Sequence, residues 1–250
     1  MGSLVRHARF FDSVVESGID LDTESVTQTR MDRKRDVTEL WVLTRDRDGL
    51  FADLTLAISA SGASVSGARL NTSRDGLVMN VFYLHSSEGM AFGRNANHQL
   101  EVLRKQSLKA AQGDISGLSV PGVIRSRRAG AIPMRPRTHF IDTKSGEQTI
   151  VEIQGRDRPG LLHALASLFH ETSLDVQSAH IEVVGTMAID AFYVSGKLTE
   201  PQRKSLRKAM LKILRDPHAP PKEKVKDKIK VKKEKKPKAS KPKKKLKKTP

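Results

Sequence analysis

Two stretches of the chain carry the same order of apolar and polar positions. Residues 40–43 and 150–153 are short apolar runs, and each is followed by a polar turn that contains glycine. Apolar side chains then recur at helical spacing, over residues 50–58 in one stretch and 161–169 in the other. Each stretch therefore predicts a strand, a turn and an amphipathic helix, in that order.

The patterns continue through further elements in the same order. Residues 64–72 and 175–183 predict strands, and the turns at 73–76 and 184–186 lead into returning strands at 77–84 and 187–194. Helices follow over 98–111 and 201–214, the second with Pro201 near its start, where its missing N–H costs nothing. Residues 137–142 can close the first copy with a fourth strand. That order is βαββαβ, the ferredoxin-like arrangement of the α+β class.

A gapless alignment of residues 40–72 with 151–183 shows the repeat directly. Eight of the 33 positions are identical: Arg45/Arg156, Asp46/Asp157, Arg47/Arg158, Gly49/Gly160, Leu50/Leu161, Leu54/Leu165, Val65/Val176 and Ala68/Ala179. A one-residue deletion then aligns Phe82 with Phe192. Two copies are too few for a solenoid, so we expect two similar domains in tandem. No apolar strand follows residue 217, so the second sheet has three strands or borrows one.

These observations divide the chain into four parts. Residues 1–35 are expected to form a connector with a weak helix at 10–15, residues 36–143 a first domain with a long loop at 113–134, and residues 147–216 a second domain. Residues 217–250 form a lysine-rich tail, which holds about +13 of the formal net charge of +17. With so few apolar residues, the tail is expected to be disordered. The tail is either simply solvated or in weak contact with polyanions. One alternative function for the chain is therefore nucleic-acid binding through this tail.

Composition excludes several classes of protein. The chain has no cysteine, which rules out disulfides and cysteine-based metal sites. No apolar run is long enough to span a membrane, and the N-terminus lacks the apolar segment of a signal peptide. We therefore expect a soluble, cytoplasmic protein without membrane contact.

The turn after each first strand, written Asp-x-x-Gly-Leu in both copies, is typical of ACT domains. The stretches "VTELWVLTRDRDGLF", "VEIQGRDRPGLL" and "SAHIEVVGTMAIDAFYV" resemble the C-terminal regulatory part of bifunctional uridylyltransferase/uridylyl-removing enzymes, which modify the PII nitrogen-signalling protein. The segment "RHARFF" resembles the end of the domain that precedes this part. The resemblance covers residues 36–215. It implies two tandem ACT domains, an amino-acid ligand that is glutamine, and PII or separate catalytic domains as partners.

The catalytic domains of that family have no counterpart in this sequence. A phosphohydrolase of the HD type needs a His-Asp dipeptide for its metal, and none of the eight histidines is followed by aspartate. Gly2-Ser3 and Asp20-Leu21-Asp22 match fragments of a nucleotidyltransferase motif, but no apolar strand surrounds Asp20. We expect no catalytic residue, metal site or cofactor here, magnesium being implied only for the absent domains. The alternative is a component of an active uridylyltransferase.

The repeated turn suits a zwitterionic ligand. A helix start has free N–H groups and partial positive charge, which attract a carboxylate, while Asp46 or Asp157 can accept from an ammonium group. Gly49 and Gly160 leave room for a ligand beside the backbone. The predicted site residues are therefore Asp46, Gly49, Leu50, Asp157, Pro159, Gly160 and Leu161. The second turn is favoured, because Pro159 stiffens it at the first helical position. The alternative is purely local, with glycine present for the turn and aspartate as a cap.

Overall fold

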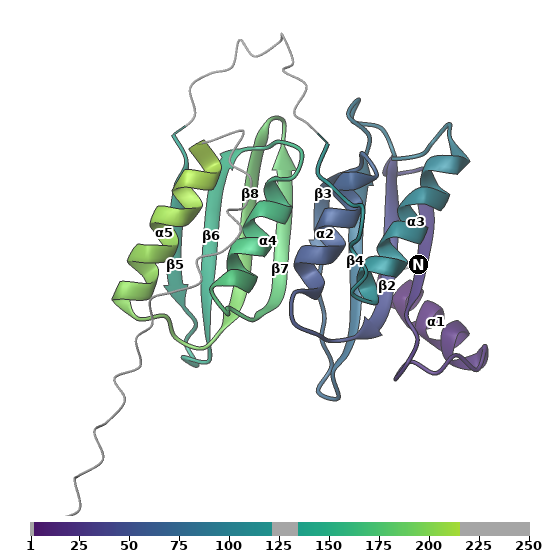
Figure 1. Cartoon of the computed structure of the whole chain (residues 1–250), viewed down its shortest axis with the longest axis horizontal. Coiled ribbons are helices and arrows are strands. Elements are labelled where there is room, and N and C mark those ends of the chain that lie inside the picture. Colours follow the sequence, from purple (N-terminus) through teal and green to yellow (C-terminus); the bar gives the residue numbers. More distant parts are fainter. Residues whose placement is uncertain (1–2, 122–134, 216–250) are drawn as a thin grey trace, which may run out of the picture.

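The computed structural model describes residues 3–121 and 135–215. Over these ranges the chain forms two α+β units, each built on a four-stranded antiparallel sheet (Figure 1). The fold class and the tandem arrangement expected from the sequence are confirmed. The lysine-rich tail at 217–250 and most of the long loop at 113–134 lie outside the described residues.

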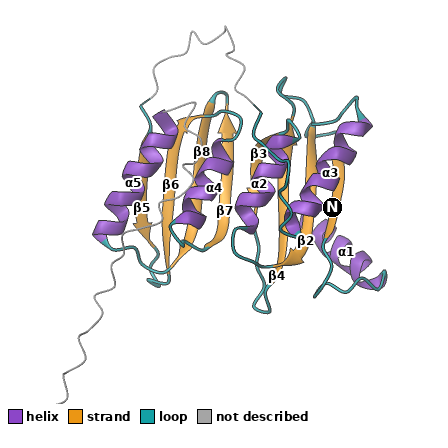
Figure 2. Ribbon diagram, viewed as in Figure 1, coloured by secondary structure: helices purple, strands orange, loops and turns teal. Residues whose placement is uncertain are grey.

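The first unit contains three helices and four strands. They are α1 (Ser3–Glu16), β1 (Val26–Asp32), β2 (Val37–Arg45), α2 (Leu50–Ala60), β3 (Ser64–Arg69), β4 (Leu77–His85) and α3 (Asn97–Ala111). The strands lie in the order β1-β2-β4-β3. The helices α2 and α3 pack side by side on one face of this sheet (Figure 2).

The second unit repeats this plan without a counterpart of α1. Its elements are β5 (Arg137–Asp142), β6 (Gln148–Arg156), α4 (Leu161–Glu171), β7 (Val176–Val184), β8 (Met187–Ser195) and α5 (Glu200–Arg215). The sheet order, β5-β6-β8-β7, is that of the first unit. Both units also interrupt the pairing of their outer strand at the same place, between Val65 and Gly67 in β3 and between Val176 and Ser178 in β7.

The edge strands of the two sheets differ from those expected from the sequence. Residues 137–142 do form a strand, β5, but it pairs with β6 of the second unit, with Phe140 opposite Val151. The fourth strand of the first sheet is β1, which lies within the stretch expected to be a connector and pairs with β2. Each unit therefore has the chain order ββαββα, and not βαββαβ. A short hairpin closes a small loop at low entropic cost, whereas joining residues 137–142 to the first sheet needs a long connection.

The amphipathic pattern of the first helix in each unit is confirmed. Six apolar side chains expected to face the sheets are all buried, with exposed fractions of 0–4%: Leu50, Leu54, Ile58, Leu161, Leu165 and Phe169. They belong to one continuous core that includes both units. Packed against this core, the ring of Phe51 from α2 lies 6.5 Å from Phe82 of its own sheet and 6.4 Å from Phe192 of the other.

The two units meet through equivalent elements. The edge strand β3 lies beside β7, and α2 lies beside α4 (Figure 1). A hydrogen-bond contact of 3.0 Å joins His163 Nδ1 of α4 to the carbonyl oxygen of Ala52 in α2, and these residues occupy the same position in the sequence repeat. The units are therefore related by an approximate two-fold axis. This arrangement brings the first turn of one unit near the far end of the helix in the other.

Helix α1 covers the opposite face of the first sheet. Phe10 and Val14 pack there on a second core cluster, and the Phe10 ring meets Trp41 edge-on at 5.0 Å. Beneath the helix, Glu39 is 1% exposed and accepts a hydrogen bond from the Trp41 indole at 3.0 Å. Arg6 of α1 pairs with Glu39 at 3.6 Å, which offsets part of the cost of burying that charge.

Neighbouring valines of α1 provide a matched test of this packing. Val14 is 5% exposed and Val15 is 53% exposed. Replacing Val14 with Asp puts an unpaired polar group into the core, so Val14→Asp should lower the free energy of unfolding by about 3 kcal/mol. Val15→Asp should change it by less than about 0.5 kcal/mol, as for ordinary surface substitutions. Urea denaturation of the two variants measures the difference, and equal effects would show that α1 does not pack on the sheet as described.

Candidate ligand site at the first strand-to-helix turn

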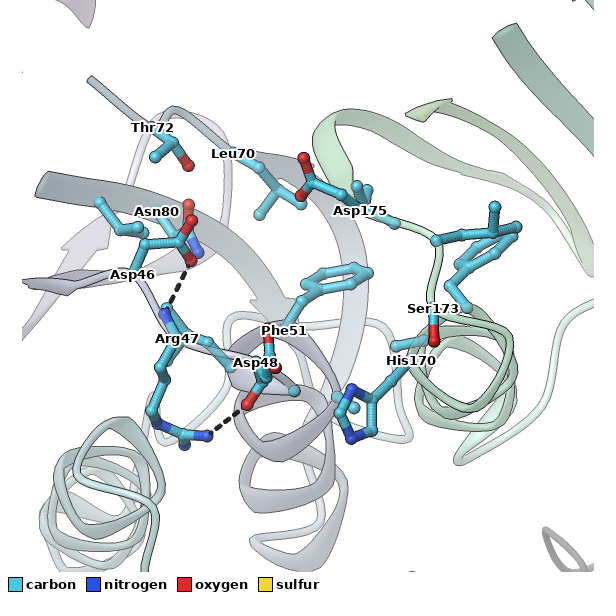
Figure 3. A pocket seen from close by; sticks show the side chains of 18 residues that line it. Asp46, Arg47, Asp48, Phe51, Leu70, Thr72, Asn80, His170, Ser173 and Asp175 are labelled. Atoms are coloured by element: carbon cyan, nitrogen blue, oxygen red, sulfur yellow. Dashed lines mark hydrogen bonds between the residues drawn. The ribbon is translucent and has the colours of Figure 1, made fainter. Parts of the chain in front are cut away.

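A pocket of about 480 Å³ opens where the first turn meets the second unit (Figure 3). Its volume lies within the range of roughly 300–1,000 Å³ that is usual for small-molecule sites. One wall comes from residues 46–52 and from the ends of β3 and β4, and the other comes from the end of α4 and the residues that lead into β7. The site is therefore shared between the two units.

The turn itself places free donors at the pocket wall. Gly49 has a φ of 77°, in the left-handed region, and caps the start of α2 without a side-chain hydrogen bond. The N–H groups of Phe51 and Ala52 in the first helical turn have no acceptor within the described chain. Unpaired N–H groups at a helix start carry partial positive charge, so this end of α2 favours an anionic group.

Arg47 anchors the turn and is not free to bind a ligand. Its guanidinium donates to the carbonyl oxygens of Ala110 and Ala111 at the end of α3 and pairs with Asp53 at 2.7 Å. Arg158 does the same in the second unit, where it donates to the carbonyl oxygen of Ile213 in α5 at 3.2 Å. The repeated arginine thus fixes each turn to the last turn of the unit's final helix, α3 or α5. The sequence repeat contained this signal, but its structural role was not inferred from it.

Carboxylates from both units face the same pocket. Burial raises the pKa of Asp46, and the nearby charges of Asp175 and Asp48 raise it further. Asp46 Oδ1 accepts one hydrogen bond, from the Arg47 N–H at 2.9 Å, and Asp175 Oδ2 accepts from Ser195 Oγ at 2.6 Å. Because the charge of Asp175 disfavours the ionised form of Asp46, a cation placed between these two carboxylates would be stabilised.

The pocket is also lined by polar side chains that were not predicted from the sequence. Asn80 on β4 is 4% exposed, and its Oδ1 accepts from the Asn71 N–H at 3.3 Å, while its Nδ2 has no acceptor within the described chain. His170 at the end of α4 lies over Gly49, with ring atoms 3.3 Å from where a Cβ of residue 49 would stand. Thr72 completes the polar wall (Figure 3). Asn80 and Thr72 belong to the first unit, whereas His170 reaches the first turn through the contact between the units, which no local sequence pattern encodes.

The second turn has a similar backbone, but a different side chain occupies the space beside its glycine. Gly160 has a φ of 74° and caps α4, so Pro159 precedes the cap and does not occupy the first helical position. The space beside Gly160 is filled by Val120, whose Cγ1 lies 2.6 Å from where a Cβ of residue 160 would stand. Both glycines are thus required by a left-handed backbone and by a close neighbour. The geometry therefore favours the first turn over the second as the ligand site.

The predicted site residues therefore fall into two groups, one at each turn. Asp46, Gly49 and Leu50 line the pocket, with the Leu50 side chain also part of the core. Asp157, Pro159, Gly160 and Leu161 form the equivalent turn of the second unit, where Leu161 is 2% exposed.

The acidic pair near the N-terminus has local structural roles. Asp20 accepts hydrogen bonds from the Asp22 N–H and from Thr23 Oγ1, both at 3.0 Å, and Asp22 pairs with Arg45. Among the residues that the structure describes, no group of three or more histidine or acidic side chains is placed to hold a metal ion. No helix within residues 3–121 and 135–215 is long and apolar enough to cross a membrane.

The comparisons with known proteins point to one enzyme type. The bifunctional uridylyltransferase/uridylyl-removing enzyme of Caulobacter vibrioides is 41% identical over 177 residues, which cover 69% of this chain and 19% of the enzyme. The enzyme with the same name from Gluconobacter oxydans is 39% identical over 194 residues, covering 72% of this chain and 20% of that protein. This chain is homologous to one region of these enzymes. It spans about a fifth of their length.

Two other comparisons add little. No family model matches the chain. A solved structure of aspartate kinase from Synechocystis aligns with a TM-score of 0.41 and 14% identity, over 85% of this chain and 39% of that one. That likeness is too low to support a conclusion.

The two units differ at one buried position next to the turns. Asn80 of β4 aligns with Asp190 of β8, and each accepts from the equivalent backbone N–H, that of Asn71 or Glu182. Asp190 is 3% exposed. Burial, together with the charge of Asp157, raises its pKa to about 7, from an ordinary value of 3.8.

This difference predicts how stability depends on pH. Since the folded-state pKa is raised, the favourable contribution of protonated Asp190 is fully present below its unfolded pKa and is lost as the pH rises through about 7. Asparagine resembles the protonated acid. The free energy of unfolding of Asp190→Asn should therefore exceed that of the unmodified chain by on the order of 2 kcal/mol at pH 8, and the two should be nearly equal at pH 4. Urea denaturation at both pH values measures this. A difference that does not change with pH would contradict the assignment.

Proposed function

We propose that this chain is an amino-acid-sensing regulatory module, with glutamine as its ligand, of a PII uridylyltransferase/uridylyl-removing system. The observation that carries the proposal is the pocket at the first turn, where free N–H groups of α2 and carboxylates of both units line one cavity. The homology to one region of uridylyltransferase/uridylyl-removing enzymes supports the choice of system.

The pocket offers complementary charges for the main-chain groups of an amino acid. The α-carboxylate would accept from the N–H groups of Phe51 and Ala52, which have no acceptor within the described chain. The ammonium group would lie between Asp46 and Asp175, whose mutual repulsion it would relieve. Charge-assisted hydrogen bonds of this kind are stronger than neutral ones, so both ends of the zwitterion would add to affinity.

Glutamine is chosen on the family resemblance, and the polar wall is compatible with it. Asn80 and Thr72 line the pocket and can exchange hydrogen bonds with a neutral amide side chain. No positively charged side chain of the described lining is free for an acidic ligand, because Arg47 is held by α3 and Asp53. These two features favour a ligand with an uncharged polar side chain.

A site shared between two units is suited to regulation. A ligand that contacts the first turn and the end of α4 at once would favour the arrangement in which these elements are close together. A ligand changes a conformational equilibrium only through such a difference in affinity between states. We propose that the bound arrangement is read by PII or by catalytic domains that act with this module.

Two aspartates at equivalent positions provide the test. Asp46→Asn removes the carboxylate proposed to bind the ammonium group, while Asp157→Asn makes the same change at the turn where Val120 lies beside Gly160. In calorimetric titration with glutamine, Asp46→Asn should weaken binding at least tenfold, a loss of about 1.4 kcal/mol. Asp157→Asn should leave the dissociation constant within about twofold, a change of roughly 0.4 kcal/mol. The absence of both binding heat and a thermal shift at millimolar glutamine would rule out the proposed ligand for this module. Loss of binding in Asp157→Asn alone would move the site to the second turn.

A further inference from the structure

A short segment after α3 lies against the second turn. Residues 117–121 follow the end of that helix without forming a helix or strand, and we name them the strap. Leu118 packs, half-buried, on the main core, and Val120 is half-buried beside Gly160. Ser119, between them, is exposed. Alternate side chains of the strap therefore point inward and pack against the rest of the protein.

The approximate two-fold axis explains why the strap is needed at this place. In the first unit the space beside Gly49 is occupied by the His170 ring, from the end of the helix in the other unit. The residue that aligns with His170 is Ser59 of α2, whose side chain is much smaller. Ser59 cannot fill the equivalent space beside Gly160. Val120 occupies that space instead, and it comes from the segment that follows α3.

The strap also begins where the first turn is anchored. Arg47 donates to the carbonyl oxygens of Ala110 and Ala111, immediately before the segment that leads into the strap. Asp114 continues this anchorage, with an ion pair to Lys109 at 3.8 Å and a hydrogen bond from the Ser116 N–H at 3.1 Å. A continuous set of contacts therefore joins the first turn, through the end of α3 and the strap, to Gly160.

We propose that residues 117–121 act as an internal strap that closes the second turn, so that the two related turns are unequal and only the first is open to a ligand. The inference deepens the proposed function, because it sets one ligand site per chain where the sequence repeat suggests two. It also identifies the strap as the element that links the two turns.

The absence of cysteine from the chain makes the strap directly testable. Two single-cysteine variants of the full chain, Val120→Cys and Ser119→Cys, differ by one position and report the inward and outward sides of the strap. Reaction with a thiol reagent under native conditions should be at least about tenfold slower for the cysteine at 120, because that side chain packs beside Gly160 whereas position 119 is exposed. Equal rates in native protein, with equal rates in urea as the control, would overturn the proposal.

A third variant shows whether packing of the strap causes the protection. Adding Leu118→Ala to the Val120→Cys chain removes the neighbouring anchor and should raise the labelling rate of the cysteine at 120 several-fold. It should leave the rate in the Ser119→Cys chain unchanged. If the rate at 120 does not respond, the protection does not come from the strap, and the proposal fails.

A binding measurement with glutamine distinguishes failure of the strap proposal from failure of the proposed function. Calorimetry of the unmodified chain with glutamine should give one site per chain, and two equivalent sites would overturn the strap proposal. A complete absence of binding would refute glutamine sensing, while the labelling rates at 119 and 120 would still decide whether the strap closes the second turn.

Discussion

The contact between the two units is the constraint on which the candidate site depends. The strands β3 and β7 lie side by side, α2 packs on α4, and the ring of Phe51 joins the two halves of one core. Neither unit forms the pocket alone. The first turn supplies donors and Asp46, whereas Asp175 and His170 come from the second unit. A change that separates the units would therefore remove the site even if both sheets stayed folded.

The repeat has kept a scaffold while its two turns have diverged. Arg47 and Arg158 each fasten a turn to a helix end, and Gly49 and Gly160 each take the left-handed conformation that begins the next helix. The differences lie around this scaffold. His170 lies over one glycine and Val120 over the other, and Asn80 in one sheet corresponds to Asp190 in the other. Equivalent backbone turns thus have different neighbours in the two units, and the described pocket lies at the first turn.

Much of the fold could be predicted from the sequence, because local periodicity determines the elements. The six apolar positions of α2 and α4 are buried as expected, and the two returning strands are in place. The edge strands were assigned wrongly for a physical reason. β1 is half-exposed and rich in polar residues, so its pattern resembles a connector, and β5 can pair with either sheet as far as sequence alone can tell.

The site was predictable only in part for a related reason. The Asp-x-x-Gly-Leu turn identified Asp46, Gly49 and Leu50, since these residues are adjacent in the chain. Asp175 and His170 reach the same pocket only through packing between the units, and Asn80 reaches it through the pairing of β4 with β2, which no local pattern encodes. The preference for the second turn rested on Pro159, and the obstruction by Val120 comes from a segment nearly forty residues earlier.

The most direct test of a single site shared by two units is an NMR titration of the chain with glutamine. Backbone amide shifts should change together in residues 46–52 and 170–176, with one common dissociation constant, because both segments line the same pocket. Residues 157–163 should change little. Shift changes confined to one unit, or centred on residues 157–163, would contradict the account.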